Sequence, residues 1–414
     1  MGADAAADDD EDAVVGPAAR VGRGEAAAEC GVAAQRAAAL AALAARADTH
    51  ATAARAPRTR RAYATDWAHF TGWCATAGRD ALPAGVDTVR LYLADLEAIR
   101  DPDGSAMFSP ATMARRLAAI AAAHRDAGHP SPTRDPAVGA VLTGIKRTRA
   151  HTTHQMRPLL LDDVRTLLSG MEYGTWPGGL TAARDAVVLL AGFAGALRRG
   201  ELAALTVGDL TFHPADGLHV RIRSSKTDQD ARGATIVLPY GRYAGTCPPC
   251  AVLRWLRLLE AAPRGRATLM RAVLTTPAWT DQDHLYPHPD ADDAPETGMD
   301  RPARNASGAH APVPTLPDAA PLLRAIRRGA TLTDTPITGD ALHAMIRRRA
   351  QSAGLPGPVG FHSLRAGFVT TARRAGADHR AVRRQTRHTS DATVETYDRD
   401  HAPLLGNAVT RLGL

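Results

Sequence analysis

The chain has 414 residues and a hydrophobic fraction of 45%, enough to bury a sizeable core, and its length suggests two or three domains. No apolar run reaches the roughly 18 residues that cross a membrane. The acidic N-terminus is unlike a secretory signal, so we expect a cytoplasmic protein. Four cysteines do not make a disulfide framework, which fits a reducing compartment.

Charge is distributed unevenly along the chain and among residue types. Lys and Arg together number 50 against 43 Asp and Glu, which gives a net charge of +7. The first 55 residues are acidic, so residues 56–414 carry a net charge of +11, compatible with a polyanionic partner. Only Lys146 and Lys226 are lysines, and the other 48 basic residues are arginines. This bias raises the question of what a lysine does here that an arginine does not.

The N-terminal part of the chain divides into a tail and a helical domain. Residues 1–55 are rich in alanine and lack a sustained helical stripe of large apolar residues, which predicts a mostly disordered acidic tail. In residues 56–150 four stretches carry apolar residues at helical spacing, and the third opens with Ser109-Pro110, an N-cap followed by proline. We therefore expect a small all-α domain. Its helix ends are rich in arginine, which by itself favours a solvated surface.

A second, larger domain is predicted at residues 156–414. The apolar run at 184–197 is too short for a membrane and suits a buried helix. Alternating residues at 218–223, a polar turn and the stretch at 235–238 predict a β-hairpin, with Lys226 in its turn. The fold class is therefore mainly α with a small antiparallel β-sheet.

The rest of this domain contains an insertion and more helices. Residues 276–321 are rich in proline and acidic residues, which predicts a long surface insertion. Helical patterning resumes at Leu322 and again at 340–353, and continues in three short helices to about residue 400. The pair Cys247 and Cys250 has metal or redox spacing, but no second pair lies nearby, which favours a turn before a helix.

Four segments carry residues with chemistry for a phosphodiester. The first holds Arg198 and Glu201, and the second is the hairpin turn with Lys226. A third segment, at 361–367, contains a His-x-x-Arg pair, and a fourth pairs a histidine with a tyrosine nine residues later. Each segment is common by itself, as a helix cap, an ion pair, a solvated turn or a half-buried tyrosine. Their order and spacing together point to one site.

The chemistry of these residue types is consistent with strand cleavage. Two arginines can clamp the non-bridging oxygens of one phosphate and stabilise the extra charge of its transition state. A tyrosine nucleophile forms a phosphate ester that preserves the bond energy for resealing. A lysine ammonium can protonate a leaving oxygen, which arginine cannot do. No carboxylate cluster or His/Cys set suggests a metal, so we expect neither metal nor cofactor.

The order of the four segments resembles the tyrosine recombinases, the phage-integrase superfamily, over about residues 56–275 and 320–405. Arg198 with Glu201 matches the first arginine box of that family, and the other segments match its hairpin lysine, its His-x-x-Arg box and its final histidine and nucleophile. The catalytic residues that the resemblance implies are Arg198, Lys226, His362, Arg365, His388 and Tyr397.

The resemblance also implies what these residues do. The two arginines would hold the scissile phosphate, the lysine would protonate the leaving oxygen, and the histidines would assist proton transfer and phosphate binding. The tyrosine would form a 3′-phosphotyrosyl bond. The enzyme would be a site-specific DNA recombinase, located at the nucleoid, that cuts and rejoins strands.

The resemblance further implies partners. The helical segment at 56–150 resembles the core-binding domain of the family, which closes with the catalytic domain as a clamp around double-stranded DNA. A homotetramer on two synapsed sites is expected, and an accessory DNA-bending factor is left open. Arginines at the helix ends become candidate DNA contacts: Arg58, Arg60, Arg61, Arg115 and Arg116.

The chain departs from the family at Arg387, where glycine is frequent before the final histidine. Two alternatives share much of this pattern. One is a type IB topoisomerase or telomere resolvase with the same chemistry and another outcome. The other is a DNA-binding relative that no longer cuts, which the complete set of polar positions disfavours.

Overall fold

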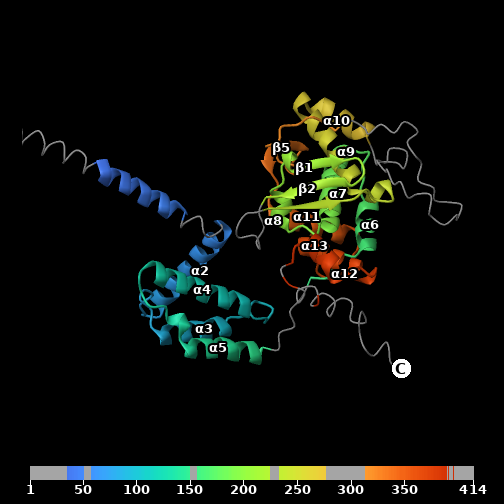
Figure 1. Cartoon of the computed structure of the whole chain (residues 1–414). Coiled ribbons are helices and arrows are strands. Elements are labelled where there is room, and N and C mark those ends of the chain that lie inside the picture. Colours follow the sequence, from blue (N-terminus) through green and yellow to red (C-terminus); the bar gives the residue numbers. More distant parts are fainter. Residues whose placement is uncertain are drawn as a thin grey trace, which may run out of the picture. The chain divides into compact units, whose positions relative to one another are not determined.

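The computed structural model of the chain describes residues 35–50, 57–149, 156–223, 233–276, 313–388, 390 and 395. Contacts divide the chain into two compact units, Met1–Thr153 and His154–Leu414 (Figure 1). Within the described residues, no helix has the length and apolar character needed to span a membrane.

Part of the predicted tail is helical. Residues 35–50 form a helix that is exposed along its whole length. The stretch is dominated by alanine, which has the highest intrinsic helix propensity, and that preference does not need an apolar stripe. The remainder of the predicted tail lies outside the described residues.

The N-terminal unit contains the four helices that the sequence predicts. Ser109 caps α4 by accepting a hydrogen bond from the Thr112 amide at 3.2 Å, and Asp135 caps α5 by accepting from the Ala137 amide at 2.8 Å. Proline follows each cap as the first helical residue. The helices are α2 (Pro57–Thr76), α3 (Val86–Ala98), α4 (Pro110–Asp126) and α5 (Pro136–Thr148).

A polar network lies in the core of this unit and includes one of the predicted DNA contacts. The side chain of Arg116 is 8% exposed, and its Nη1 donates to the Tyr92 hydroxyl at 3.1 Å and lies 3.1 Å from His69. Asp66, itself buried, is bonded by Arg115 at 2.7 Å. The prediction that Arg116 contacts DNA is therefore wrong, because a core position with buried partners removes its guanidinium from the surface. Arg115 is half-exposed.

The C-terminal unit is built from helices with two small antiparallel sheets. Figure 1 shows α12 and α13 together at one end of the unit and α10 at the other. The helices are α6 (Leu161–Ser169), α7 (Gly178–Ala194), α8 (Arg199–Ala203), α9 (Pro248–Ala261), α10 (Arg266–Thr275), α11 (Gly339–Ser352), α12 (Phe361–Arg374) and α13 (His379–Thr386). The strands are β1 (Leu210–His213), β2 (Gly217–Ile222), β3 (Ala234–Leu238), β4 (Arg324–Arg327) and β5 (Thr331–Pro336).

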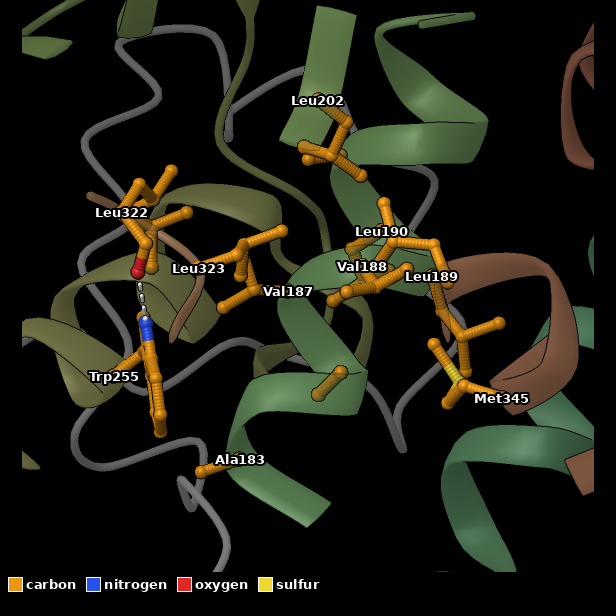
Figure 2. Close-up of a cluster of buried hydrophobic side chains, with 14 of the residues drawn as sticks. Ala183, Val187, Val188, Leu189, Leu190, Leu202, Trp255, Leu322, Leu323 and Met345 are labelled. Atoms are coloured by element: carbon orange, nitrogen blue, oxygen red, sulfur yellow. Dashed lines mark hydrogen bonds between the residues drawn. The ribbon is translucent and has the colours of Figure 1, made fainter. Parts of the chain in front are cut away.

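The core of this unit surrounds α7, which is buried on nearly all sides. Figure 2 shows Val187 of α7 facing Leu323, with Trp255 of α9 beside Leu322. The indole of Trp255 is fully buried and donates its Nε1–H to the Leu322 carbonyl at 2.7 Å. The buried indole therefore keeps a partner for its only donor, and it fixes the segment that enters β4.

The sheets confirm one sequence prediction and correct another. The predicted hairpin is present as β2 and β3, with Val220 opposite Ile236, and β1 adds a strand on the other edge of β2. The helical patterning predicted from Leu322 is wrong, because that segment forms the β4–β5 hairpin. Its turn uses left-handed backbone at Gly329 (φ 82°) and Ala330 (φ 62°), and leucines 322 and 323 enter the core.

Helix α12 packs closely against the segment that precedes α6. The Leu159 amide donates to the Ser363 carbonyl at 2.9 Å, and a Cβ on Gly367 would lie 1.7 Å from the Leu159 carbonyl oxygen. Only glycine allows this approach, so Gly367 sets the position of α12. The His-x-x-Arg pair lies on the first turns of this helix.

We expect Gly367→Ala to lower the free energy of unfolding by about 2 kcal/mol, because the added Cβ forces the backbone of α12 or of Leu159 to move. The urea midpoint of the purified protein measures this change. The control is Gly200→Ala in α8, whose Cβ would meet nothing within 4 Å and should change the midpoint little. Equal midpoints for Gly367→Ala and the wild type would contradict this account of the packing.

Candidate active site

The first arginine box forms a capped turn between α7 and α8. Arg198 is the N-cap residue of α8, and its backbone N–H donates to Glu201 Oε2 at 2.9 Å. The guanidinium of Arg198 donates from Nη1 to Glu201 Oε1 at 2.8 Å. The spacing of three residues places the glutamate in the capping position, which explains why an Arg-x-x-Glu motif opens a helix. The side chain of Arg198 stays 25% exposed.

Arg365 joins this turn to the end of α13. It lies on α12, is 1% exposed, and donates from Nη1 to the Ala196 carbonyl at 2.6 Å and from Nη2 to the Thr386 carbonyl. Ala196 has a left-handed backbone (φ 44°), just before the capped turn. Two neutral carbonyl oxygens thus compensate part of the cost of burying this charge.

His388 follows α13 and is held by its neighbours. Its Nδ1 lies 3.0 Å from the Thr386 hydroxyl, which is fully buried. Gln385 bonds the Ala194 carbonyl at 2.7 Å and the Val237 carbonyl of β3 at 3.2 Å. These bonds bring the end of α13 to both α7 and the β2–β3 hairpin.

Arg387, the position at which the chain departs from the family, has a left-handed backbone (φ 57°, ψ 41°) at the end of α13. That conformation is easy for glycine and disfavoured for a residue with a Cβ, which gives a physical reason for a frequent glycine there. The side chain is 11% exposed, and its Nη2 donates to Glu201 Oε2 at 2.7 Å. Arg387 thus pairs with the glutamate of the first arginine box.

The electrostatics show that the predicted histidines and arginines act on one another. Desolvation, followed by the charges of Arg365 and Arg198, lowers the pKa of His362. Desolvation and the same two arginines, with smaller contributions from His362 and Arg387, lower the pKa of His388 to about 3. Both imidazoles are therefore neutral near pH 7. Each can donate a hydrogen bond from one ring nitrogen and accept one at the other.

Four of the six predicted catalytic residues come together in this site. The other two, Lys226 and Tyr397, lie outside the described residues, and so do their contacts. Sequence reasoning missed the contributions of Thr386, Gln385 and Arg387. A polar residue next to a motif is a weak signal, and the long-range bonds that give these residues their place cannot be derived from spacing.

Basic residues continue along the surface of α13. A depression beside His388 is lined by Arg380, Arg383 and Arg384, together with Asp378 and His379. This surface offers several guanidinium groups to an anion next to the site. The predicted contacts Arg58, Arg60 and Arg61 are exposed at the start of α2, in the other unit.

Among the described residues, one group has the donor atoms of a metal site. His213, Asp216 and His219 lie at the β1–β2 turn, with Asp216 Oδ2 at 3.2 Å from His213 Nδ1 and 3.1 Å from His219 Nε2. His213 Nδ1 also accepts from the Asp216 amide at 3.1 Å. Hydrogen bonds among its own members account for this cluster, which lies where β1 turns into β2.

Comparison with known proteins finds a relative over most of the chain. No family model matches the chain. An integrase/recombinase XerD homolog of Selenomonas ruminantium is 28% identical over 362 residues, which cover 86% of each chain. The chain is therefore similar over most of its length to an integrase/recombinase, which agrees with the resemblance to the tyrosine recombinase superfamily in the sequence. The mainly helical fold with small antiparallel sheets agrees with the predicted fold class.

Solved structures of tyrosine recombinases also match the chain. A lambda integrase dimer bound to a COC′ core site has a TM-score of 0.43 at 14% identity, covering 86% of this chain and 93% of that one. The Tn1549 transposon integrase in complex with transposon right end DNA has a TM-score of 0.43 at 15% identity, with coverages of 80% and 86%. XerH bound to a palindromic difH substrate has a TM-score of 0.42 at 14% identity, with coverages of 80% and 71%.

We expect the imidazole of His388 to stay neutral at pH 5, because two arginines and burial oppose its protonation. Nitrogen chemical shifts of labelled histidine, assigned with His388→Asn, measure its protonation. Unfolded histidine titrates near pH 6.5. The lowered pKa in the folded state therefore means that stability is present above pH 6.5 and is lost as the pH falls toward 3. The His388→Asn variant should lose less stability over this range, and an imidazolium signal at pH 5 would contradict the assignment.

Proposed function

We propose that the chain is a site-specific DNA recombinase that cuts and rejoins strands through a 3′-phosphotyrosyl bond to Tyr397. The observation that carries the proposal is the convergence of Arg198, His362, Arg365 and His388 from three separate segments. The similarity to the Selenomonas relative, which is named as an integrase/recombinase, supports the same reaction.

The arginines of the site suit the binding of a scissile phosphate. Arg198 has an exposed part of its guanidinium, and Arg365 fixes the turn on which Arg198 lies. The site carries more cationic than anionic groups, with Glu201 as the carboxylate bonded to Arg198. Such a preorganised excess of positive charge stabilises the additional negative charge of a pentacoordinate phosphorus more than that of the ground state.

The proposed reaction proceeds without a change in the number of phosphoester bonds. The phenolic oxygen of Tyr397 attacks phosphorus and gives its proton to a neutral imidazole of the site, while the bond from phosphorus to the 5′ oxygen breaks. Lys226 gives a proton to that leaving oxygen. The 5′ hydroxyl of another strand then attacks the phosphotyrosine, which releases Tyr397. The neutral imidazoles of His362 and His388 are suited to hydrogen bonds with the phosphate or to proton transfer.

The proposed partner is double-stranded DNA carrying a recombination site. The arginines along α13 lie next to the site, and those at 58–61 lie on the exposed start of α2. We propose that both groups bind phosphates and that the two units close on DNA as a clamp. Action as a homotetramer on two synapsed sites belongs to the same proposal.

A covalent-adduct assay tests the proposal. The substrate is nicked suicide DNA prepared as overlapping fragments of the sequence that flanks the gene, so that a cleaved strand cannot be resealed. We expect a protein–DNA adduct that resists denaturation and that Tyr397→Phe abolishes. No adduct on any fragment would favour a binding protein without catalysis. An adduct that persists in Tyr397→Phe would refute the nucleophile, and relaxation of supercoiled DNA without pairing of two sites would indicate a topoisomerase.

We expect Lys226→Ala to reduce adduct formation by about 100-fold, the usual order for loss of a general acid. The same variant should cleave a substrate with a 5′-bridging phosphorothiolate nearly as fast as the wild type, because a thiolate leaves without protonation. Rates on both substrates measure the role of the lysine. A defect of equal size on the two substrates would contradict proton donation by Lys226.

A further inference from the structure

We propose that Arg387 is a positioning residue that occupies one oxygen of Glu201 and so keeps Arg198 available to the scissile phosphate, an inference that rests on the proposed function. The backbone at Arg387 is left-handed, where a residue with a Cβ is disfavoured. An arginine in such a position has a conformational disadvantage relative to glycine. The contact of its guanidinium with Glu201 is what an arginine adds at this position.

The guanidinium of Arg387 shares a buried carboxylate with Arg198. Glu201 is 4% exposed, and its Oε1 accepts from Arg198 Nη1 at 2.8 Å, while its Oε2 accepts from Arg387 Nη2 at 2.7 Å. The Arg387 side chain is held in this place by a second bond, from its Nη1 to the Gln385 carbonyl at 3.0 Å. The contact crosses from the end of α13 to the start of α8.

This sharing limits how Arg198 can pair with Glu201. A carboxylate and a guanidinium preferably form two parallel bonds, which occupy one whole edge of each group. Here the guanidinium of Arg198 bonds only Oε1 of Glu201. The second oxygen, Oε2, already accepts from Arg387 Nη2 and from the Arg198 backbone amide. Without Arg387, Arg198 can rotate into a two-bond pair and have its charge neutralised by Glu201.

The different exposure of Arg387 and Arg198 agrees with different roles for the two side chains. Arg387 is 11% exposed and its guanidinium faces Glu201, whereas Arg198 is 25% exposed at the site. Arg387 therefore does not touch the phosphate in this account. It acts through Glu201 on the orientation and the effective charge of Arg198.

Three variants separate this mechanism from a merely conformational effect. Arg387→Gln removes the charge, Arg387→Lys keeps it, and Arg387→Gly removes the side chain while relieving the left-handed backbone. If only the turn mattered, Arg387→Gly would match the wild type. We expect Arg387→Gly and Arg387→Gln to slow adduct formation about tenfold, less than the roughly hundredfold that a misplacement of about 1 Å can cost, and Arg387→Lys to recover part of the rate. Thermal melting of each variant checks that it folds.

The substrate supplies a readout that a purely structural role does not move. Adduct formation is measured on the suicide DNA that the wild type cleaves and on the same DNA with a methylphosphonate at the scissile position. The methyl group replaces a charged oxygen, so the reaction depends less on Arg198. The tenfold defect of Arg387→Gln should shrink to about threefold or less on this substrate.

The control variant is Arg264→Gln, which removes an arginine that is 65% exposed and lies 3.8 Å from Glu260 on the surface. It should match the wild type on both substrates. Wild-type rates in Arg387→Gln and Arg387→Gly, or a defect of equal size on both substrates, would overturn the inference. Absence of any adduct with the wild type is a different result, because it contradicts the proposed function itself.

Discussion

Arg365 holds together the two turns that form the site, because its buried guanidinium donates to the carbonyl oxygens of Ala196 and Thr386. One of these turns presents Arg198, and the other presents His388. Burying a guanidinium costs free energy unless its N–H groups have acceptors. Both carbonyl oxygens must therefore stay within hydrogen-bond distance of Arg365. Arg365 lies on α12, whose own position is set by the close approach of Gly367 to Leu159, so the packing of that helix also places the guanidinium between the two turns.

The same arrangement determines the proton chemistry of the site. The guanidinium groups stay charged at every working pH, so the imidazoles are the groups that lose their protons. Their charges, added to desolvation, lower the pKa of His362 and His388. Glu201 balances part of the positive charge and joins the arginine box to the end of α13 through Arg387. A phosphate that enters such a site meets an excess of positive charge and neutral imidazoles.

Local patterns in the sequence predict much of this architecture. The caps Ser109 and Asp135, the alternating residues of β2 and the buried run of α7 each act over a few residues, and the structure has the expected elements. The predictions fail where distant packing decides. The β4–β5 hairpin forms because its preceding leucines enter the core around α7, and a short segment fits helix and strand patterns about equally well.

Some features of the site are likewise predicted by local sequence patterns, and others depend on distant contacts. The spacing of Arg198 with Glu201, and of His362 with Arg365, reflects helix geometry and is visible in the sequence. The contact of Arg387 with Glu201 joins positions 186 residues apart and depends on a left-handed turn, so no local pattern predicts it. Arg116 shows the opposite error, since an arginine in a basic stretch lies in the core.

Arg254 shows what an arginine offers over a lysine at a buried position of this fold. Arg254 is buried on α9, donates to the Thr276 carbonyl, and keeps a pKa of about 10 although desolvation lowers it. A lysine in such a place starts from a lower pKa and presents three donors in place of a planar fork, so it loses its proton more readily on burial. Arginine therefore suits positions where a charge has to be permanent. The proposed role of Lys226 is the converse case, since a group that must give up a proton in each reaction cannot be an arginine.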